Sequence, residues 1–400
     1  MSASDKSKAG FQTRAIHFGH NGESHFGSVA QPVYMTSTFA FDEVAEAQAV
    51  FSGESDRYVY GRQHNPTQEA LEIRLASLEA AEAAVVFGSG MGAISSVLMT
   101  LLSAGDELIV HHTMYATATS LVSDGLPRFG IKVKRVDLSR PEELAKAMTP
   151  ATKIVYFETP VNPNCEVLHI RALSEIAHRS GALVMVDSTF GSPALQRPLE
   201  HGADIVVHSM TKYINGHGDL LGGVALGEHA IMQKVRSVGL KYMTGSTLSP
   251  MNCFLVMRGL KTLALRMRQH SETAFAIAKH LAAHPKVQSV NYPMLDGNRD
   301  YQIAVQQMSM GGGMLSFELK TGYDGTIQFM NRLQLIARAI SLGDTDSLIM
   351  HPGAFMRALQ KQSPEAKLSD GVTMGLMRLS VGLEDCEDLI ADFEQALADV

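Results

Sequence analysis

The stretch Val207-His208-Ser209-Met210-Thr211-Lys212-Tyr213 decides the fold of this chain. It includes the end of an apolar run, residues 205–207, which is typical of a parallel strand buried on both faces. An earlier apolar run, residues 182–186, ends at Asp187. Because the carboxyl ends of parallel strands face the crevice in which ligands bind, we expect Asp187 and Lys212 to lie at one site.

The side chains at these two strand ends are those that a pyridoxal phosphate enzyme requires. The amine of Lys212 can form a Schiff base, and the carboxylate of Asp187 can keep the pyridine nitrogen protonated. The hydroxyl groups of Ser209 and Thr211 can bind the phosphate. A lysine after a strand is usually a solvated surface charge, but the neighbours of Lys212 argue against that interpretation.

A glycine-rich segment, Gly88-Ser89-Gly90-Met91-Gly92, follows the apolar run Ala84–Phe87 and opens a helical pattern. Backbone N–H groups at a helix N-terminus bind phosphate well, so the amides of Gly90 and Met91 are candidate donors. The alternative, a dinucleotide fold, requires G-x-G-x-x-G and an acidic residue at the end of the next strand. Here the spacing is G-x-G-x-G and Asp106-Glu107 begins that strand, which disfavours the dinucleotide fold.

Composition narrows the class of protein. The 400 residues are 45% hydrophobic and 19% charged, as in folded globular proteins, and the net charge of -7 argues against nucleic acid as the main partner. Three widely separated cysteines indicate a reducing compartment. We find no signal peptide and no apolar run long enough to span a membrane. The sequence therefore predicts a cytoplasmic globular protein.

The sixteen histidines raise the question of a metal site. The pairs His111-His112 and His208 with His217 are the closest candidates. Neither H-E-x-x-H nor C-x-x-C spacing accompanies them, so no metal is expected.

Apolar strands and helical patterns alternate over the middle of the chain, which predicts an α/β fold with a mostly parallel sheet covered by helices. After residue 260 a long helical stretch, Lys261–His284, leads to short strands, including Ala339–Leu342 and Leu376–Val381, and these indicate a smaller α+β domain. We expect an N-terminal arm over 1–62, a cofactor domain over 63–260 and a C-terminal domain over 261–400. The predicted strands of the cofactor domain are Ala84–Phe87, Glu107–Val110, Ile131–Val136, Ile154–Phe157, Leu183–Val186, Ile205–Val207 and Gly223–Leu226.

Motifs over nearly the whole chain resemble those of the Cys/Met-metabolism family of pyridoxal phosphate enzymes, and most closely its methionine γ-lyases. Together they are highly specific for the family and much less so for the substrate. The matching motifs are Tyr60-Gly61-Arg62, Asn65-Pro66-Thr67, Gly88–Gly92, Phe157-Glu158-Thr159-Pro160, Asn162-Pro163-Asn164, Asp187, Gln196-Arg197-Pro198, His208–Tyr213, Gly216–Asp219, Gly239-Leu240-Lys241, Ser341-Leu342-Gly343 and Arg378–Gly382.

The resemblance implies a fold-type I enzyme that assembles as a homotetramer of two catalytic dimers. Lys212 would hold the cofactor and later shuttle protons, Asp187 would pair with the pyridine nitrogen, and Asn162 would lie near the ring hydroxyl. The residues implied to bind the phosphate from within the subunit are Ser89, Gly90, Met91, Ser209 and Thr211.

Other roles implied by the resemblance concern the neighbouring subunit and the substrate. Tyr60 and Arg62 would reach the phosphate of the neighbouring subunit. Tyr115 would stack on the cofactor ring and act as acid or base at the γ-position. Arg378 would clamp the substrate carboxylate, which its planar fork fits, with Ser341 close by.

The chain departs from the methionine γ-lyase pattern near the expected pocket. Thr117 stands where a Cys is usual, Tyr242 replaces the Asp that follows the lysine equivalent to Lys241, and Arg357 is gained in the segment 351–357. Ser188 also replaces the more usual Asn. These changes are either neutral or adapt the pocket to another γ-substituent. Thr117, Lys241 and Tyr242 are therefore candidate substrate-contacting residues.

The function expected is a γ-lyase that cleaves the Cγ–heteroatom bond of an L-amino acid. Methionine or homocysteine is the default substrate, giving a 2-keto acid and ammonia, and a relative such as canavanine, giving homoserine, stays open. The alternative is γ-replacement, as in an O-acylhomoserine sulfhydrylase or cystathionine γ-synthase, with Arg357 recognising a succinyl carboxylate. More remote alternatives are a dinucleotide-dependent oxidoreductase and a non-catalytic binding protein.

Overall fold

The larger of two sheets positions the site. The computed structural model describes residues 9–20, 22–361, 368, 371–398 and 400. In this part of the chain, seven strands follow the order β1-β7-β6-β5-β4-β2-β3, and all neighbours are parallel except β7, which is antiparallel to β1 and β6. The strands are β1 (Ala83–Phe87), β2 (Glu107–His111), β3 (Lys132–Val136), β4 (Thr152–Glu158), β5 (Leu183–Asp187), β6 (Ile205–Ser209) and β7 (Gly223–Gly227).

Each of the seven apolar runs forms one of these strands, with ends that differ by at most two residues. Apart from the edge strand β3, the central residues of these strands, such as Val155 and Val206, are fully buried, because helices cover both faces of the sheet. The mostly parallel α/β sheet expected from the sequence is confirmed.

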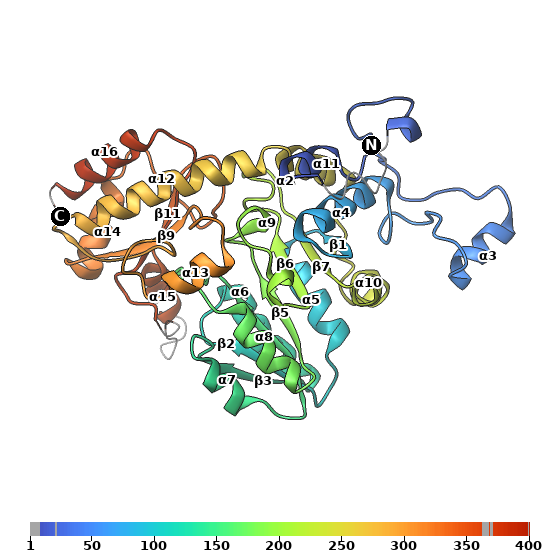
Figure 1. Cartoon of the computed structure of the whole chain (residues 1–400), viewed down its shortest axis with the longest axis horizontal. Coiled ribbons are helices and arrows are strands. Elements are labelled where there is room, and N and C mark those ends of the chain that lie inside the picture. The colour runs from blue at the N-terminus through green and yellow to red at the C-terminus, as the bar shows by residue number, and fades with distance from the viewer. Residues whose placement is uncertain (1–8, 21, 362–367, 369–370, 399) are drawn as a thin grey trace.

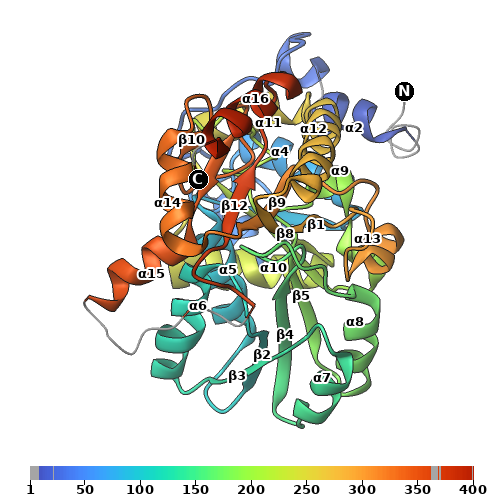
Figure 2. The ribbon, with the colours of Figure 1, turned by 90° about the vertical axis from the view of Figure 1, so that its left-hand side faces the viewer.

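Helices α5 and α6 lie on one face of this sheet, and α7 and α8 on the other (Figure 2). Helix α4 begins at Asn65, whose side chain accepts the N–H of Thr67 at 2.8 Å. The helical segments around the larger sheet are α4 (Pro66–Glu79), α5 (Gly90–Leu101), α6 (Ala116–Ser120), η2 (Leu121–Gly125), η3 (Leu126–Phe129), α7 (Pro141–Ala147), α8 (Ile170–Arg179), α9 (Ser192–Leu195), η4 (Pro198–His201), α10 (His229–Lys234), η5 (Val235–Thr244) and α11 (Pro250–Leu260).

A second sheet of five strands, in the order β10-β11-β12-β9-β8, forms the smaller α+β unit, and its pairs are antiparallel except β10 with β11. Its strands are β8 (Val287–Asn291), β9 (Met314–Leu319), β10 (Ala337–Arg338), β11 (Leu348–Met350) and β12 (Met377–Ser380). Its helices are α12 (Leu263–Ala283), α13 (Tyr301–Gln307), α14 (Gly322–Arg332), α15 (Pro352–Gln360) and α16 (Cys386–Leu397).

The strand predicted over Ala339–Leu342 is wrong. The strand β10 lies just before it, and residues 339–342 form a loop. The carbonyl oxygens of Ile340 and Ser341 each accept a hydrogen bond of 3.0 Å from the guanidinium of Arg378. The N–H of Ala339 bonds to β11, at the carbonyl oxygen of Ile349, but the next two carbonyl groups bond to a side chain instead, which an apolar pattern cannot reveal.

The first 62 residues begin with short helical segments, α2 (Phe11–His17), η1 (Gly22–His25) and α3 (Val44–Ser52). Helix α2 lies on α4, whereas α3 extends away from the rest of the chain (Figure 1). On α3, Val44 and Phe51 are 78% and 79% exposed. Residues 1–8 and 21 of the expected arm, and 362–367, 369–370 and 399 of the expected C-terminal domain, lie outside the described residues.

Among the residues that the structure describes, no helix combines the length and the apolar character that crossing a membrane requires.

Candidate active site

Lys212 lies in the turn that follows β6, and it contacts the smaller unit. Its Nζ donates a hydrogen bond of 2.8 Å to the Oγ of Ser341. The loop that carries Ser341 packs tightly on this turn, since a Cβ at Gly343 would lie 2.7 Å from the backbone nitrogen of Tyr213. Burial, followed by the positive charge of Arg378, lowers the pKa of Lys212, and Asp344 opposes this shift. At a given pH, a larger fraction of the Lys212 amine is therefore neutral than of an exposed lysine amine.

Arg378, on β12, is 3% exposed and contacts Ser341, the residue to which Lys212 is bonded. Its Nη1 donates to the Oδ1 of Asn162 at 2.8 Å, and its Nη2 donates to the two carbonyl groups of the Ser341 loop. Its Nε is buried and, within the described part of the chain, has no hydrogen-bond partner. Burial lowers the pKa of Arg378 to about 10. A buried guanidinium that has an N–H donor without a partner can bind an anion.

Asp187 ends β5, beside β6, and Thr189 connects it to the phosphate-binding candidates. The N–H of Thr189 donates to Asp187 Oδ1 at 2.9 Å, and the N–H of Ser209 donates to Thr189 Oγ1 at 2.9 Å. Burial raises the pKa of Asp187, and the hydrogen bonds from Thr189 oppose this effect. Thr189 was missed in the sequence, although an Asp-x-Thr spacing after a strand is a signal for such a turn.

The glycine-rich segment forms the N-terminus of α5, next to the end of β6. Ser89 is the N-cap, and its Oγ accepts the N–H of Gly92 at 3.0 Å. A Cβ at Gly90 would lie 2.9 Å from the Cβ of Ser209, and one at Gly223 would lie 2.1 Å from the carbonyl oxygen of Ser89. Glycine is therefore required here, because two backbones approach each other closely. Thr211, in the same region, holds the N–H of Gly222 at 3.1 Å.

Glu158 is a second residue to which no role was assigned from the sequence, although it belongs to the family motif Phe157-Glu158-Thr159-Pro160. It ends β4 and is 4% exposed, and its carboxylate accepts the backbone N–H groups of Tyr115 and Asn162. Its position at the end of a parallel strand is the same signal that singles out Asp187. Tyr115 itself is 43% exposed, and Thr117 is exposed one residue into α6.

Tyr60 and Arg62 form a different group, with Lys241 and Tyr242. The Nη1 of Arg62 donates to the carbonyl oxygen of Lys241, and its guanidinium lies 5.4 Å from the centre of the Tyr60 ring. Tyr60 and Tyr242 are 44% and 65% exposed. Among the contacts of the described residues, none joins this group to Lys212.

The residues around Lys212 fit pyridoxal phosphate. A partly buried amine with a lowered pKa suits attachment to an aldehyde, and a carboxylate at the neighbouring strand end suits a pyridine nitrogen. The N-terminus of α5, where a Cβ on Gly90 would fill the space toward Ser209, suits a phosphate. The site therefore has the three kinds of group that this cofactor needs.

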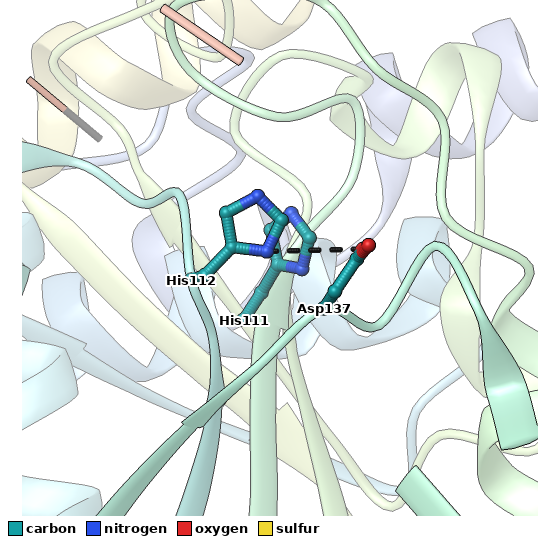
Figure 3. Close-up of side chains that lie close together, drawn as sticks. All are labelled: His111, His112 and Asp137. Atoms are coloured by element: carbon teal, nitrogen blue, oxygen red, sulfur yellow. Dashed lines mark ion pairs between the residues drawn. The ribbon is translucent and has the colours of Figure 1, made fainter. Parts of the chain in front are cut away.

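His111, His112 and Asp137 lie together at the ends of β2 and β3 (Figure 3), and their ligand atoms lie within 4.8 Å of one another. The Nδ1 of His111 accepts the N–H of Leu138 at 3.1 Å, and its Nε2 faces Glu166 at 3.5 Å. Asp137 Oδ1 lies 3.7 Å from His112 Nδ1 and accepts a hydrogen bond from Ser139. The cluster therefore combines two hydrogen bonds, from Leu138 and Ser139, with longer ion-pair contacts to Glu166 and between His112 and Asp137.

Comparison with known proteins agrees with this site. Over 97% of each chain, the protein is 48% identical to an L-methionine γ-lyase of Pseudomonas putida. It is 40% identical to an O-succinylhomoserine sulfhydrylase of Pseudomonas aeruginosa, over 99% of this chain and 97% of that protein. The crystal structure of metB from Corynebacterium glutamicum matches 99% of both chains with a TM-score of 0.91 and 34% identity.

The family model for Cys/Met metabolism PLP-dependent enzymes matches residues 12–398. This confirms the resemblance noted in the sequence, the cofactor and the fold class. The chain belongs to the Cys/Met metabolism family of pyridoxal phosphate-dependent enzymes.

Proposed function

We propose that this enzyme is a γ-lyase that cleaves the Cγ–heteroatom bond of an L-amino acid and releases a 2-keto acid and ammonia. The observation that carries the proposal is the arrangement of Lys212 and Arg378 on either side of Ser341. A substrate carboxylate bound by the buried Arg378 holds the α-carbon of the amino acid near the Lys212 amine. The similarity to an L-methionine γ-lyase along the whole chain supports elimination at Cγ.

Each residue of the site has a task in this proposal. When bound, the cofactor supplies an electron sink for the negative charge that develops on the substrate. Lys212 binds the cofactor and moves protons at Cα and Cβ, and its lowered pKa suits this task near neutral pH. Asp187 keeps the pyridine nitrogen protonated, and Asn162 lies near the ring hydroxyl.

The phosphate is assigned to the N-terminus of α5 and the end of β6. The N–H groups in the first turn of a helix have no partner within the helix. Ser89 satisfies those of Gly92 and Ala93, so the amides of Gly90 and Met91 are the donors that we assign to the phosphate. Ser89, Ser209 and Thr211 add hydroxyl groups.

Tyr115 is the proposed acid that protonates the leaving group at Cγ while its ring stacks on the cofactor. Its position at the N-cap of α6 and its exposed side chain support this role, because an exposed side chain is accessible to a ligand.

We further propose a homotetramer of two catalytic dimers, with a cytoplasmic location. Tyr60 and Arg62 would complete the site of a neighbouring subunit, since within one chain Arg62 contacts Lys241 and the Tyr60 ring instead of the Lys212 site. The exposed apolar side chains of α3 support burial against another chain, because such side chains gain from leaving water. The division into an arm over 1–62, a cofactor domain over 63–260 and a C-terminal domain over 261–400 is part of this proposal.

Methionine or homocysteine is the substrate that we propose first. Thr117 and Tyr242 differ from the methionine γ-lyase pattern, which favours testing canavanine as well. The alternative function is γ-replacement, which the similarity to an O-succinylhomoserine sulfhydrylase supports. For that function Arg357 is the candidate for a succinyl group, yet its guanidinium lies 3.5 Å from the centre of the Tyr323 ring and is already stacked.

The decisive assay offers each candidate amino acid with and without sulfide or cysteine. Keto acid and ammonia formed without a nucleophile support elimination. A thioether formed only when a thiol is present would establish replacement instead. Borohydride should trap the cofactor on Lys212, which peptide mass spectrometry detects, and Lys212→Ala should abolish this modification.

A further inference from the structure

One buried carboxylate holds two site residues from different loops. Glu158 Oε1 accepts the backbone N–H of Tyr115 at 2.5 Å, and Oε2 accepts that of Asn162 at 3.3 Å. Tyr115 precedes α6, whereas Asn162 lies in the loop after β4. The two oxygens of one carboxyl group thus accept N–H groups from two different loops. The Glu158 side chain therefore fixes the distance between these two loops.

The connection continues to the substrate-binding candidate. Asn162 Oδ1 accepts a hydrogen bond of 2.8 Å from Arg378 Nη1. A continuous chain of bonds thus runs from the backbone of Tyr115 through Glu158 and Asn162 to the guanidinium of Arg378. The proposed acid and the proposed carboxylate clamp are tied to the same side chain.

The location of Glu158 is unfavourable for a carboxylate. It pairs in register with Asp187 on the neighbouring strand, so two carboxylates lie side by side at the strand ends. Burial and the charge of Asp187 raise the pKa of Glu158 to about 8, although the two N–H groups and Arg378 oppose the shift. A buried group held at such a cost is a candidate for function.

We propose that Glu158 is a positioning residue, which acts on the reaction by holding the main chains of Tyr115 and Asn162 at fixed places beside Arg378. The proposal rests on the roles given above to Tyr115 and Arg378. It differs from a purely structural role, because the segments that it holds carry side chains of the site.

The test compares Glu158→Gln with a matched control, Glu107→Gln. Glu107 is also 4% exposed and lies on the same sheet, but it begins strand β2, whereas Glu158 ends strand β4. The carboxylate of Glu107 accepts hydrogen bonds from Thr149 and Thr152. An amide at position 158 keeps one acceptor oxygen and turns an N–H donor toward one of the two backbone N–H groups. We expect kcat to fall roughly a hundredfold and KM to rise, since both loops shift. Glu107→Gln should leave both constants nearly unchanged.

Measuring the effect of Glu158→Gln in a Tyr115→Phe variant distinguishes a positioning role from a general loss of structure. Tyr115→Phe removes the hydroxyl group that Glu158 is proposed to place. If Glu158 acts through Tyr115, adding Glu158→Gln to Tyr115→Phe should lower kcat little further, because coupled residues are not additive. Glu158→Asp, which keeps the charge with a shorter side chain, should lie between the wild type and Glu158→Gln. Affinity of the apoenzyme for pyridoxal phosphate, followed by absorbance, and the thermal midpoint give readouts independent of turnover.

Three results would overturn the proposal: an unaffected Glu158→Gln variant, equal losses in Glu158→Gln and Glu107→Gln, or a full additional loss of kcat in the Tyr115→Phe background. If Glu158→Gln does not fold, Glu158→Asp supplies the same comparison. Failure of the proposed function gives a different result, namely no keto acid from the wild type with any candidate substrate. Wild-type turnover with an unaffected Glu158→Gln variant would reject the positioning role alone.

Discussion

The amine of Lys212 and the hydroxyl of Ser341 are 2.8 Å apart, and this hydrogen bond joins the two sheets at the site. The loop of Ser341 is in turn fixed by Arg378, which donates to the carbonyl groups of Ile340 and Ser341. The position of the reacting amine is therefore set by the smaller unit as well as by the sheet that carries it.

Ser341→Ala should slow catalysis without unfolding the protein. The change removes one hydrogen bond to Lys212 and leaves the loop attached to Arg378, so we expect kcat/KM to fall about fivefold to tenfold. Steady-state kinetics and a denaturant curve measured on the same sample test this. Ser341→Thr keeps the hydroxyl group and should retain most of the activity. Equal activity of Ser341→Ala and the wild type would show that the contact does not matter for catalysis.

The pH dependence of cofactor capture should reveal the lowered pKa of Lys212. A lysine must be neutral to attack an aldehyde, so the capture rate of the apoenzyme should rise with pH and level off earlier than for an exposed lysine, whose pKa is about 10.4. Between the folded and unfolded pKa values the unfolded chain binds more protons, so this group makes stability rise with pH in that window. Borohydride trapping at a series of pH values measures the midpoint.

Burial is the main cause of the lowered pKa of Lys212, and the second cause, the charge of Arg378, can be tested by substitution. Arg378→Met removes the positive charge and should move the midpoint of capture to higher pH, whereas Arg378→Lys should keep it low. A midpoint for the wild type in the range of an exposed lysine would contradict the prediction.

Site residues at the ends of parallel strands can be predicted from local sequence patterns, whereas contacts between separate loops cannot. Lys212, Asp187 and the segment Gly88–Gly92 stand at the ends of apolar strands, and parallel strands bring their ends together, so a local pattern was enough to place them. Glu158 ends β4 in the same way. Its two hydrogen-bond donors, however, come from separate loops whose approach no local pattern encodes.

Contacts between distant segments also explain two further features of the structure. Residues 339–342 resemble a strand, but Arg378, distant in sequence, binds the carbonyl groups of Ile340 and Ser341. Tyr60 and Arg62 carry a family motif whose implied task lies in a neighbouring subunit, and within one chain Arg62 contacts Lys241 and the Tyr60 ring. Contacts between segments that are distant in sequence decide both cases.

The buried pair of Glu79 and His208 should be important for stability. Their side chains are each 1% exposed, and His208 Nε2 lies 2.9 Å from Glu79 Oε2. Glu79→Ala leaves the imidazole buried without this partner, so we expect a loss of about 3 kcal/mol in the free energy of unfolding. Glu200→Ala breaks the exposed pair with Arg197 and should cost less than about 1 kcal/mol. Similar losses for both variants in denaturant unfolding would argue against this interpretation of the buried pair.

Gly223→Ala should weaken cofactor binding, because the added methyl group would displace the N-terminus of α5, which we assign to the phosphate. A Cβ at this position of β7 would lie 2.1 Å from the carbonyl oxygen of Ser89 and 2.8 Å from the nitrogen of Gly90. Both atoms belong to backbone, which cannot move aside as a flexible side chain does, so the N-terminus of α5 must shift. We expect the affinity of the apoenzyme for pyridoxal phosphate to fall by about tenfold or more, because phosphate binding there depends on the placement of backbone N–H groups. Gly10→Ala is the matched control, since no atom lies within 4 Å of its Cβ position, and its affinity should match the wild type. If absorbance titration gives equal affinities for Gly223→Ala and Gly10→Ala, the amides of Gly90 and Met91 are not the donors that hold the phosphate.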